Sequence, residues 1–278
     1  MVRAVLPAHA WRARLELHFG RRAGRSVITH RRHVGPLVVQ RPFYPEGDVC
    51  HVYVLHPPGG VVGGDDLEII AAVDQRAHAL ITTPASGKFY RSDRLKASLR
   101  QRLSIAANGV MEWLPQETIL FSGSHVAMTT HVDVASNSDF IGWDILCLGR
   151  PASGESYQSG FCRQAFEIWR DQQPLIIERA MFNGNSELLS APWGLAGYSV
   201  VGTMIALNAD ASLLAPLREI EPGKDNGLFS ATLIDGVLVC RFLGHQGEVA
   251  RKCFIQAWQR IRQKLIGRPA LVPRIWNT

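Results

Sequence analysis

Two acidic residues lie inside apolar stretches of this chain, where an ionised carboxylate is unusual. Asp144 lies within residues 140–148, and Glu178 lies within residues 175–182. Burying an unpaired charge is costly, so each carboxylate needs a counter-charge, a proton, water or a cation. Two interpretations remain open. Either Glu178 pairs with an arginine and Asp144 faces solvent, or both residues line a polar, water-filled passage.

A segment rich in glycine and proline, residues 57–64, directly precedes the adjacent carboxylates Asp65 and Asp66. Glycine adopts backbone angles that other residues avoid and proline fixes them, so the segment predicts two specified bends. Gly59 and Gly64 have the outer spacing of a phosphate-binding loop, but that motif requires Lys and Ser or Thr next, and carboxylates repel phosphate. Nucleotide binding is therefore not expected here, whereas a β-rich hydrolase that uses Asp65 and Asp66 with a divalent metal remains an alternative.

The cysteines and histidines show no metal-ligand spacing. Cys50, His51 and His56 are close in sequence, but no C-x-x-C, H-x-H or H-E-x-x-H pattern occurs, and G-x-S-x-G is missing. The five scattered cysteines predict reduced core residues. No run approaches the roughly 20 apolar residues of a membrane helix, and the N-terminus lacks a signal-peptide core, so a cytoplasmic protein with no membrane partner is expected.

The formal net charge is +6, and the excess of arginine is concentrated near the N-terminus. These arginines are Arg12, Arg14, Arg21, Arg22, Arg25, Arg31 and Arg32. They predict either a patch for an acidic partner, protein or nucleic acid, or a solvated face of strands. Aromatic residues are not interleaved for base stacking, which favours the solvated face over a nucleic-acid-binding β-barrel.

Alternating apolar and polar residues predict a mainly β protein. The alternation is clear at residues 13–19. Further strands are predicted at residues 37–40, 51–55, 67–73, 77–83, 95–105, 110–114, 126–134, 140–148, 161–169, 175–182, 200–207, 228–234 and 237–243. Asn108 with Gly109, and Asp235 with Gly236, are predicted as two-residue hairpin turns. Because the strands do not alternate with helices, a doubly wound α/β fold is not expected.

About two helices accompany the strands. Residues 209–220 carry leucines on one face, although Pro216 makes the first turn uncertain. Residues 248–266 place Phe254 and Trp258 at helical spacing and predict an amphipathic C-terminal helix. We find no internal repeat or linker, so one domain spanning residues 1–278 is predicted.

Several sequence blocks closely resemble the UreD (also called UreH) family of urease accessory proteins. They occur in family order, from about residue 10 to the end of the chain. The blocks are residues 56–65 (HPPGGVVGGD), 82–84 (TTP), 88–92 (KFYRS), 112–119 (EWLPQETI), 142–144 (GWD), 148–150 (LGR) and 273–278 (PRIWNT).

The resemblance implies a non-enzymatic maturation factor built as a helicoidal stack of short strands with a small helical part. Members of the family bind a UreF-type protein, which recruits a UreG-type GTPase carrying nickel, and the assembly docks on apo-urease. Nickel is thought to pass through internal tunnels into the urease active site. No tightly bound cofactor is implied, only nickel in transit, and no nucleic acid partner.

The same resemblance suggests which residues serve these roles. Asp65, Asp144 and Glu178 are the candidates for the passage, followed by Glu68 and Ser86. Isolated carboxylates suit this role because clusters of imidazole and thiolate would trap the metal.

The C-terminal helix and tail supply the candidate partner contacts, because aromatic residues and arginine are enriched in interface cores. These candidates are Phe254, Trp258, Arg274, Ile275 and Trp276. In the alternative interpretation, Trp258 packs into the core of this chain and Trp276 anchors its terminus.

Overall fold

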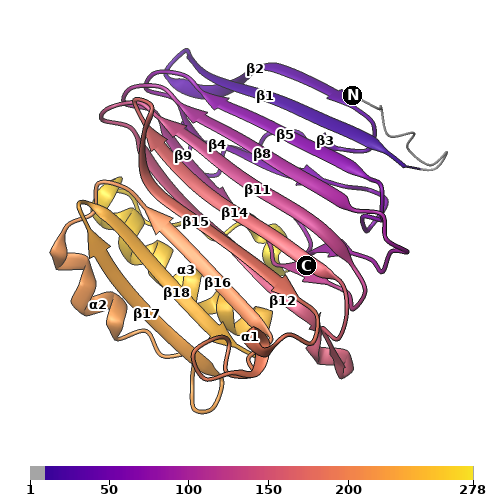
Figure 1. Cartoon of the computed structure of the whole chain (residues 1–278). Coiled ribbons are helices and arrows are strands. Elements are labelled where there is room, and N and C mark those ends of the chain that lie inside the picture. Colours follow the sequence, from indigo (N-terminus) through magenta and orange to yellow (C-terminus); the bar gives the residue numbers. More distant parts are fainter. Residues whose placement is uncertain (1–9, 278) are drawn as a thin grey trace.

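Two β-sheets packed face to face form the body of the protein (Figure 1). A computed structural model describes residues 10–277. The first sheet has seven strands, in the order β15 (Gln173–Asn183), β14 (Phe161–Arg170), β11 (His125–Val134), β8 (Ala97–Ile105), β5 (Asp66–Val73), β1 (Arg12–Arg22) and β2 (Arg25–Val34). The main path of the second sheet is β17 (Gly227–Ile234), β18 (Val237–Gly244), β16 (Val200–Ala206), β12 (Asp139–Arg150), β9 (Val110–Leu114), β6 (His78–Thr82), β4 (Cys50–Leu55) and β3 (Val38–Val39). Short strands β7 (Gly87–Phe89), β10 (Thr118–Leu120) and β13 (Glu155–Ser156) pair beside it.

The chain winds from one sheet to the other and back, so each coil stacks on the coil before it. Strands β1, β5, β8, β11 and β14 pair in parallel, as do β4, β6, β9 and β12. This arrangement confirms the predicted helicoidal stack of short strands. It also contains a structural repeat that the sequence does not reveal.

The turns that carry the chain between the sheets explain one wrong prediction. Strands β8 and β9 lie in different sheets, so Asn108 with Gly109 does not form a hairpin. Asn108 has a φ of 59°, and Arg76 and Asn137 have similar left-handed values in the corresponding turns of neighbouring coils. The turn at Asp235 joins the antiparallel strands β17 and β18, as predicted.

Three α-helices accompany the sheets: α1 (Glu187–Ser190), α2 (Leu214–Arg218) and α3 (Gly247–Leu265). Helix α3 matches the predicted amphipathic helix, and its apolar face covers the outer side of the second sheet at β12, β16 and β18. Helix α2 is shorter than predicted, because residues 211–213 form a 3₁₀ turn before Pro216 enters the first α-helical turn. No helix within residues 10–277 is long and apolar enough to cross a membrane.

The second sheet therefore has two buried faces, which produce two apolar cores. One core lies between the sheets and includes Leu15 and Phe140. The other lies under α3 and includes Trp143, Phe254 and Trp258. Because successive side chains of a strand point to opposite faces, neighbouring residues of β12 serve different cores.

A buried ionic network connects α3 to the early coils. Glu112, on β9, and Arg262, on α3, are both fully buried, with the Arg262 Nε atom 3.0 Å from Glu112 Oε2. The indole N–H of Trp258 also donates to Glu112 Oε2, at 2.5 Å, and His78 Nε2 lies 2.7 Å from Glu112 Oε1. Arg262 Nη2 donates to both carboxylate oxygens of Glu46, at 2.7 and 2.8 Å. Every charge in this network thus has an opposite charge or a hydrogen-bond partner in contact.

Candidate functional site

A band of polar side chains crosses the apolar space between the two sheets. From the seven-stranded sheet it contains Gln101 on β8, Thr130 on β11, Gln164 on β14 and Glu178 on β15; Asp144 on β12 faces it from the second sheet. Strand register places Gln101 opposite Thr130, and the same row continues through the apolar Phe166 to Glu178. Gln164 lies one inward-facing position away on β14, opposite Met128, so the polar side chains form a band across two neighbouring rows and not a single polar row.

Asp144 is the most deeply buried carboxylate of this band, with 7% of its surface exposed. Gln164 Nε2 and Thr130 Oγ1 each lie 3.4 Å from Asp144 Oδ2, at the outer limit of a hydrogen bond. Thr130 has a single hydroxyl proton, which it donates to Gln101 Oε1 at 2.6 Å. Among residues 10–277, Asp144 therefore has no strong hydrogen-bond donor and no ion-pair partner.

The pKa of Asp144 is raised from 3.8 to about 7: burial is the largest cause, Gln164 and Thr130 partly oppose it, and the negative charge of Glu178 adds to it. Glu178 itself is half-buried and forms an ion pair with Arg241 of β18. One open interpretation is therefore half correct. Glu178 does pair with an arginine, but Asp144 is buried between the sheets and does not face solvent.

Two cavities lie at the two ends of the polar band. The first has a volume of about 280 Å³ and is lined by Gln101 together with the glycine-rich segment and residues 83–89. The second has a volume of about 370 Å³ and is lined by Gln164, Glu178, Thr203 and Arg241, where the sheets separate beyond β15. The polar side chains therefore connect two openings on the surface across the interior of the molecule.

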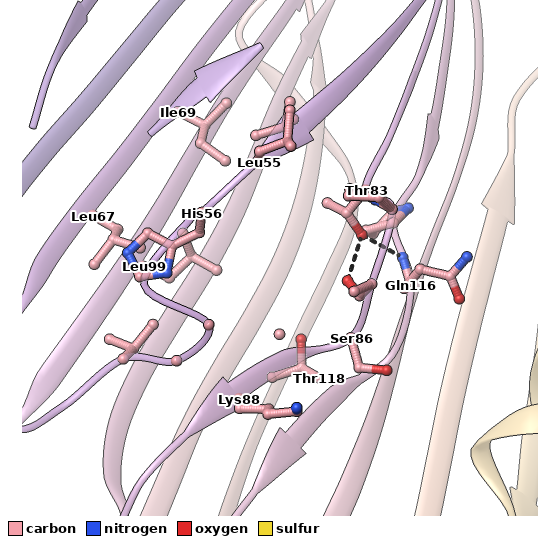
Figure 2. Close-up of a pocket in the computed structure, with 18 of the residues that line it drawn as sticks. Leu55, His56, Leu67, Ile69, Thr83, Ser86, Lys88, Leu99, Gln116 and Thr118 are labelled. Atoms are coloured by element: carbon pink, nitrogen blue, oxygen red, sulfur yellow. Dashed lines mark hydrogen bonds between the residues drawn. The ribbon is translucent and has the colours of Figure 1, made fainter. Parts of the chain in front are cut away.

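Figure 2 shows the first cavity, with His56, Leu67 and Leu99 on one side and Thr83 and Gln116 on the other. Ser86, a predicted passage residue, lines this cavity, and its hydroxyl donates to Glu117 Oε1 at 2.9 Å. Ser86 is thus at the mouth of the band, whereas Asp144 and Glu178 lie within it and at its other end.

The glycine-rich segment makes the two predicted bends at the rim of this cavity. A Cβ atom on Gly60 would lie 2.1 Å from the ring of Tyr90, so the segment can pass Tyr90 only with glycine there. Asp65 is 3% exposed and stabilises the bends: its Oδ1 accepts the Trp11 N–H at 2.8 Å and its Oδ2 accepts the Val62 N–H at 3.0 Å. Both oxygens of Asp65 are therefore occupied by backbone donors.

Asp66 and Glu68 do not lie in the polar band. Asp66 forms an ion pair with Arg100, and Glu68 forms one with Arg14, with N–O distances of 2.7 and 2.9 Å. Leu67 points inward between them, so Asp66 and Glu68 face the outer side of the sheet. Whether Asp65 or Glu68 contributes to metal transfer stays a prediction, but the structure places neither with Asp144 and Glu178.

The residues predicted to contact partners are mostly buried in this chain. Phe254 and Trp258 have no exposed surface, and Trp276 is 8% exposed and donates its indole N–H to Thr82 Oγ1 at 2.8 Å. This burial agrees with the alternative interpretation, because the apolar face of α3 and the tail pack on the second sheet, and contact of these residues with a partner stays a prediction. Arg274 is exposed and Ile275 is half-buried.

Gln101, Thr130 and Gln164 were not recognised from the sequence. The alternation of β8 could have revealed Gln101. Gln101 occupies the same alternating positions as Leu99 and Leu103, which point to the interior, whereas the residues between them are more exposed. Thr130 follows the same rule on β11. A polar residue in phase with the apolar set indicates a polar group facing the core.

Comparison with known proteins covers almost all of the described residues. The family profile described as "UreD urease accessory protein" matches residues 11–277. The chain belongs to the UreD family of urease accessory proteins.

Relatives named "Urease accessory protein UreD" match over nearly their full lengths. The protein of Citrobacter koseri is 46% identical over 271 residues, which cover 96% of this chain and 92% of the relative. That of Dechloromonas aromatica is 44% identical over 280 residues, covering 98% and 97%. That of an Azoarcus species is 46% identical, covering 96% and 94%. The UreD assignment therefore includes every strand of the polar band.

The raised pKa of Asp144 predicts a pH dependence of stability. Between pH 3.8 and about 7 the folded chain holds a proton that the unfolded chain has lost. The stabilising contribution is therefore complete below pH 3.8 and is lost as pH rises through about 7, by at most about 1.4 kcal/mol per pH unit. We expect the free energy of unfolding of the wild type, measured in urea and compared with that of Asp144→Asn, to decrease over this interval. An unchanged difference between about pH 5 and pH 7 would show that Asp144 is ionised throughout.

Proposed function

We propose that this chain is a urease-maturation scaffold that conducts nickel through the polar band between its sheets. The observation that carries the proposal is the continuous set of polar contacts from Gln101 through Thr130 and Asp144 to Gln164, which connects two surface cavities. Membership of the UreD family supports a role in urease maturation. A polar band across an apolar core costs stability, and a path for a hydrated cation gives it a purpose.

The chemistry of the band suits a metal ion that must leave again. Its side chains offer two carboxylates, two amides and a hydroxyl, and oxygen ligands of this kind hold nickel less tightly than thiolates do. Burial raises the pKa of the nearby Cys162 thiol to about 12, and the charge of Asp144 raises it as well. The thiol therefore stays protonated at neutral pH and does not trap the metal. Among residues 10–277, no three histidine, cysteine or acidic side chains are grouped closely enough to hold a metal ion.

The partners in this proposal are those of the family. A UreF-type protein binds this chain, a UreG-type GTPase delivers nickel through UreF, and apo-urease receives it. Nickel is the cargo, and this chain is a non-catalytic factor that binds no cofactor tightly. No observation favours the alternative hydrolase, because Asp65 and Asp66 do not converge on a common point.

Replacing the charged groups of the band tests the proposal. We expect Asp144→Asn and Glu178→Gln to slow the activation of apo-urease about tenfold, since each removes a charge-assisted contact worth about 1.5–3 kcal/mol. The measurement is the initial rate of urease activation with the UreF-type and UreG-type partners, GTP, bicarbonate and nickel. The exposed Glu248→Gln is the matched control.

Complex formation must be measured on the same variants by gel filtration. Slow activation by an intact complex supports the passage. Activation at the wild-type rate would remove the substituted residue from any essential path, and equal activation without this chain would refute the maturation role itself.

A further inference from the structure

The seven-stranded sheet ends at β2, and no described residue pairs with the outer side of the second half of this strand (Figure 1). We propose that this edge, residues 29–34, binds an acidic, extended segment of a partner protein, which adds to the sheet as a further strand. The inference rests on the scaffold part of the proposed function and does not depend on the nickel passage.

The first half of β2 is covered, whereas the second half is open. Ser26 is buried; its N–H donates to the carbonyl of Asp48 at 2.8 Å, and its hydroxyl accepts the N–H of His78 at 2.8 Å. Residues 29–34 are all exposed and pair only with β1. In an antiparallel pair, alternate residues point their N–H and C=O groups away from the partner strand. Among the described residues, no other backbone group satisfies those of residues 29–34.

The open half carries positive charge on both of its faces. Arg32 and His30 lie opposite Glu16 and His18 of β1 on the outer face of the sheet. Arg31 and His33 lie opposite the buried Leu17 and Leu15 of β1, so they point to the inner face, where no strand of the second sheet covers them. The segment itself contains no acidic residue.

Little negative charge balances this edge. Glu16 is the nearest carboxylate, 3.6 Å from His30, but it is already paired with Arg14 at 2.5 Å. Within the part of the chain that the structure describes, Arg31 and His33 have no ion-pair partner. A hollow of about 290 Å³, lined by Arg32 and His33, lies beside the strand. The charge therefore remains available to a ligand.

These features select an acidic polypeptide. Free backbone groups along an edge strand recognise an extended chain by strand addition, and alternate side chains set specificity. A strand added to β2 places its side chains beside cations on both faces, so aspartate or glutamate is favoured at every position and lysine is repelled. A second copy of β2 would bring arginine beside arginine, which opposes self-association through this edge. No Phe, Tyr or Trp lies in the segment to stack on bases, so a nucleic acid fits less well.

Binding of a labelled peptide to the full chain tests the inference. The probe has about twelve residues in which glutamate alternates with valine or threonine. We expect fluorescence anisotropy to show binding that weakens as salt is added, and amide hydrogen exchange of residues 29–34 to slow in the complex. Arg31→Glu combined with Arg32→Glu should weaken binding about tenfold or more, whereas the equally charge-changing pair Arg163→Glu and Lys224→Glu should not. Both control residues are exposed and lie away from β2.

Matched ligands separate strand addition from simple charge attraction. The same peptide with N-methylated amides keeps its charge but cannot form a ladder, and the same peptide with lysine in place of glutamate reverses the charge. If either the N-methylated peptide or the lysine peptide binds as tightly as the glutamate peptide, the inference is overturned. Tighter binding of a single-stranded oligonucleotide than of the glutamate peptide also overturns it, and so does no binding of the peptide at all, which would show that the arginines only protect a free edge. Asp144→Asn should bind the peptide normally. Urease activation therefore tests the nickel passage, and peptide binding tests the β2 edge, independently of each other.

Discussion

Glu112→Ala is expected to lower the free energy of unfolding by about 3–5 kcal/mol. The substitution leaves the fully buried Arg262 guanidinium without one of its two carboxylates, and it also removes the acceptor of the Trp258 indole. Breaking a buried pair by removing one partner is strongly destabilising, because the remaining charge has lost its compensation. Urea unfolding followed by tryptophan fluorescence measures the change.

Glu248→Ala is the matched control, because Glu248 lies on the same helix in an exposed ion pair with Lys252. A similar loss of stability in both variants would contradict the special role of the buried network.

A pH series adds a second test. Burial alone raises the pKa of Glu112, but His78, Arg262 and Trp258 together lower it from 4.5 to about 2. Its contribution to stability is therefore present above pH 4.5 and is lost as pH falls towards 2, and Glu112→Ala should lack this acid-dependent loss.

Trp276→Ala is expected to destabilise the chain by about 3–5 kcal/mol, the usual cost of removing a buried tryptophan. The Trp276 ring packs against Trp143 and Trp258, with centroid distances of 5.8 and 6.1 Å, and its N–H is bonded to Thr82. Losing the ring opens a cavity at the end of the core under α3. The midpoint of urea unfolding measures the effect.

Trp193→Ala provides the comparison, because Trp193 is 70% exposed and its removal opens no cavity. The pair also decides between the two interpretations of the C-terminal tail. A residue that anchors the tail changes stability in the isolated chain. If Trp276→Ala unfolds like the wild type but binds the UreF-type partner more weakly, Trp276 is an interface residue and the packing described here is not its main role.

The periodicity of the sequence predicts most strands well and their connections poorly. Residues 67–73 and 126–134 alternate because one face of each strand is buried, which is a local property. The turn at Asn108 has the same residues whether the chain returns to a neighbouring strand or crosses to the other sheet. Only the pairing partners, which lie in other coils, decide between them. Strand β2 was missed because residues 29–34 are exposed on both faces and so have no apolar period.

The candidate site was predictable where a charge interrupts an apolar run. Asp144 and Glu178 were found in this way, and Ser86 came from the family resemblance. Arg262 was not recognised as buried, because a basic residue near the end of an amphipathic helix is typical of a solvated terminus. Its burial depends on Glu112 and Glu46, which precede it by 150 and 216 residues, and no local pattern reports such contacts.

The bonds that fix α3 and residues 268–276 join them to residues that are synthesised about 200 positions earlier. Arg262 bonds Glu46, Arg268 bonds Asp48 and Trp276 bonds Thr82, across 216, 220 and 194 residues. On the ribosome, each coil can stack on the preceding coil as it emerges. The side of the second sheet that carries Trp143 must wait for residues 247–276. A nascent chain therefore presents an apolar face until residues 247–276 have emerged, and a pause in synthesis before that point exposes it to aggregation.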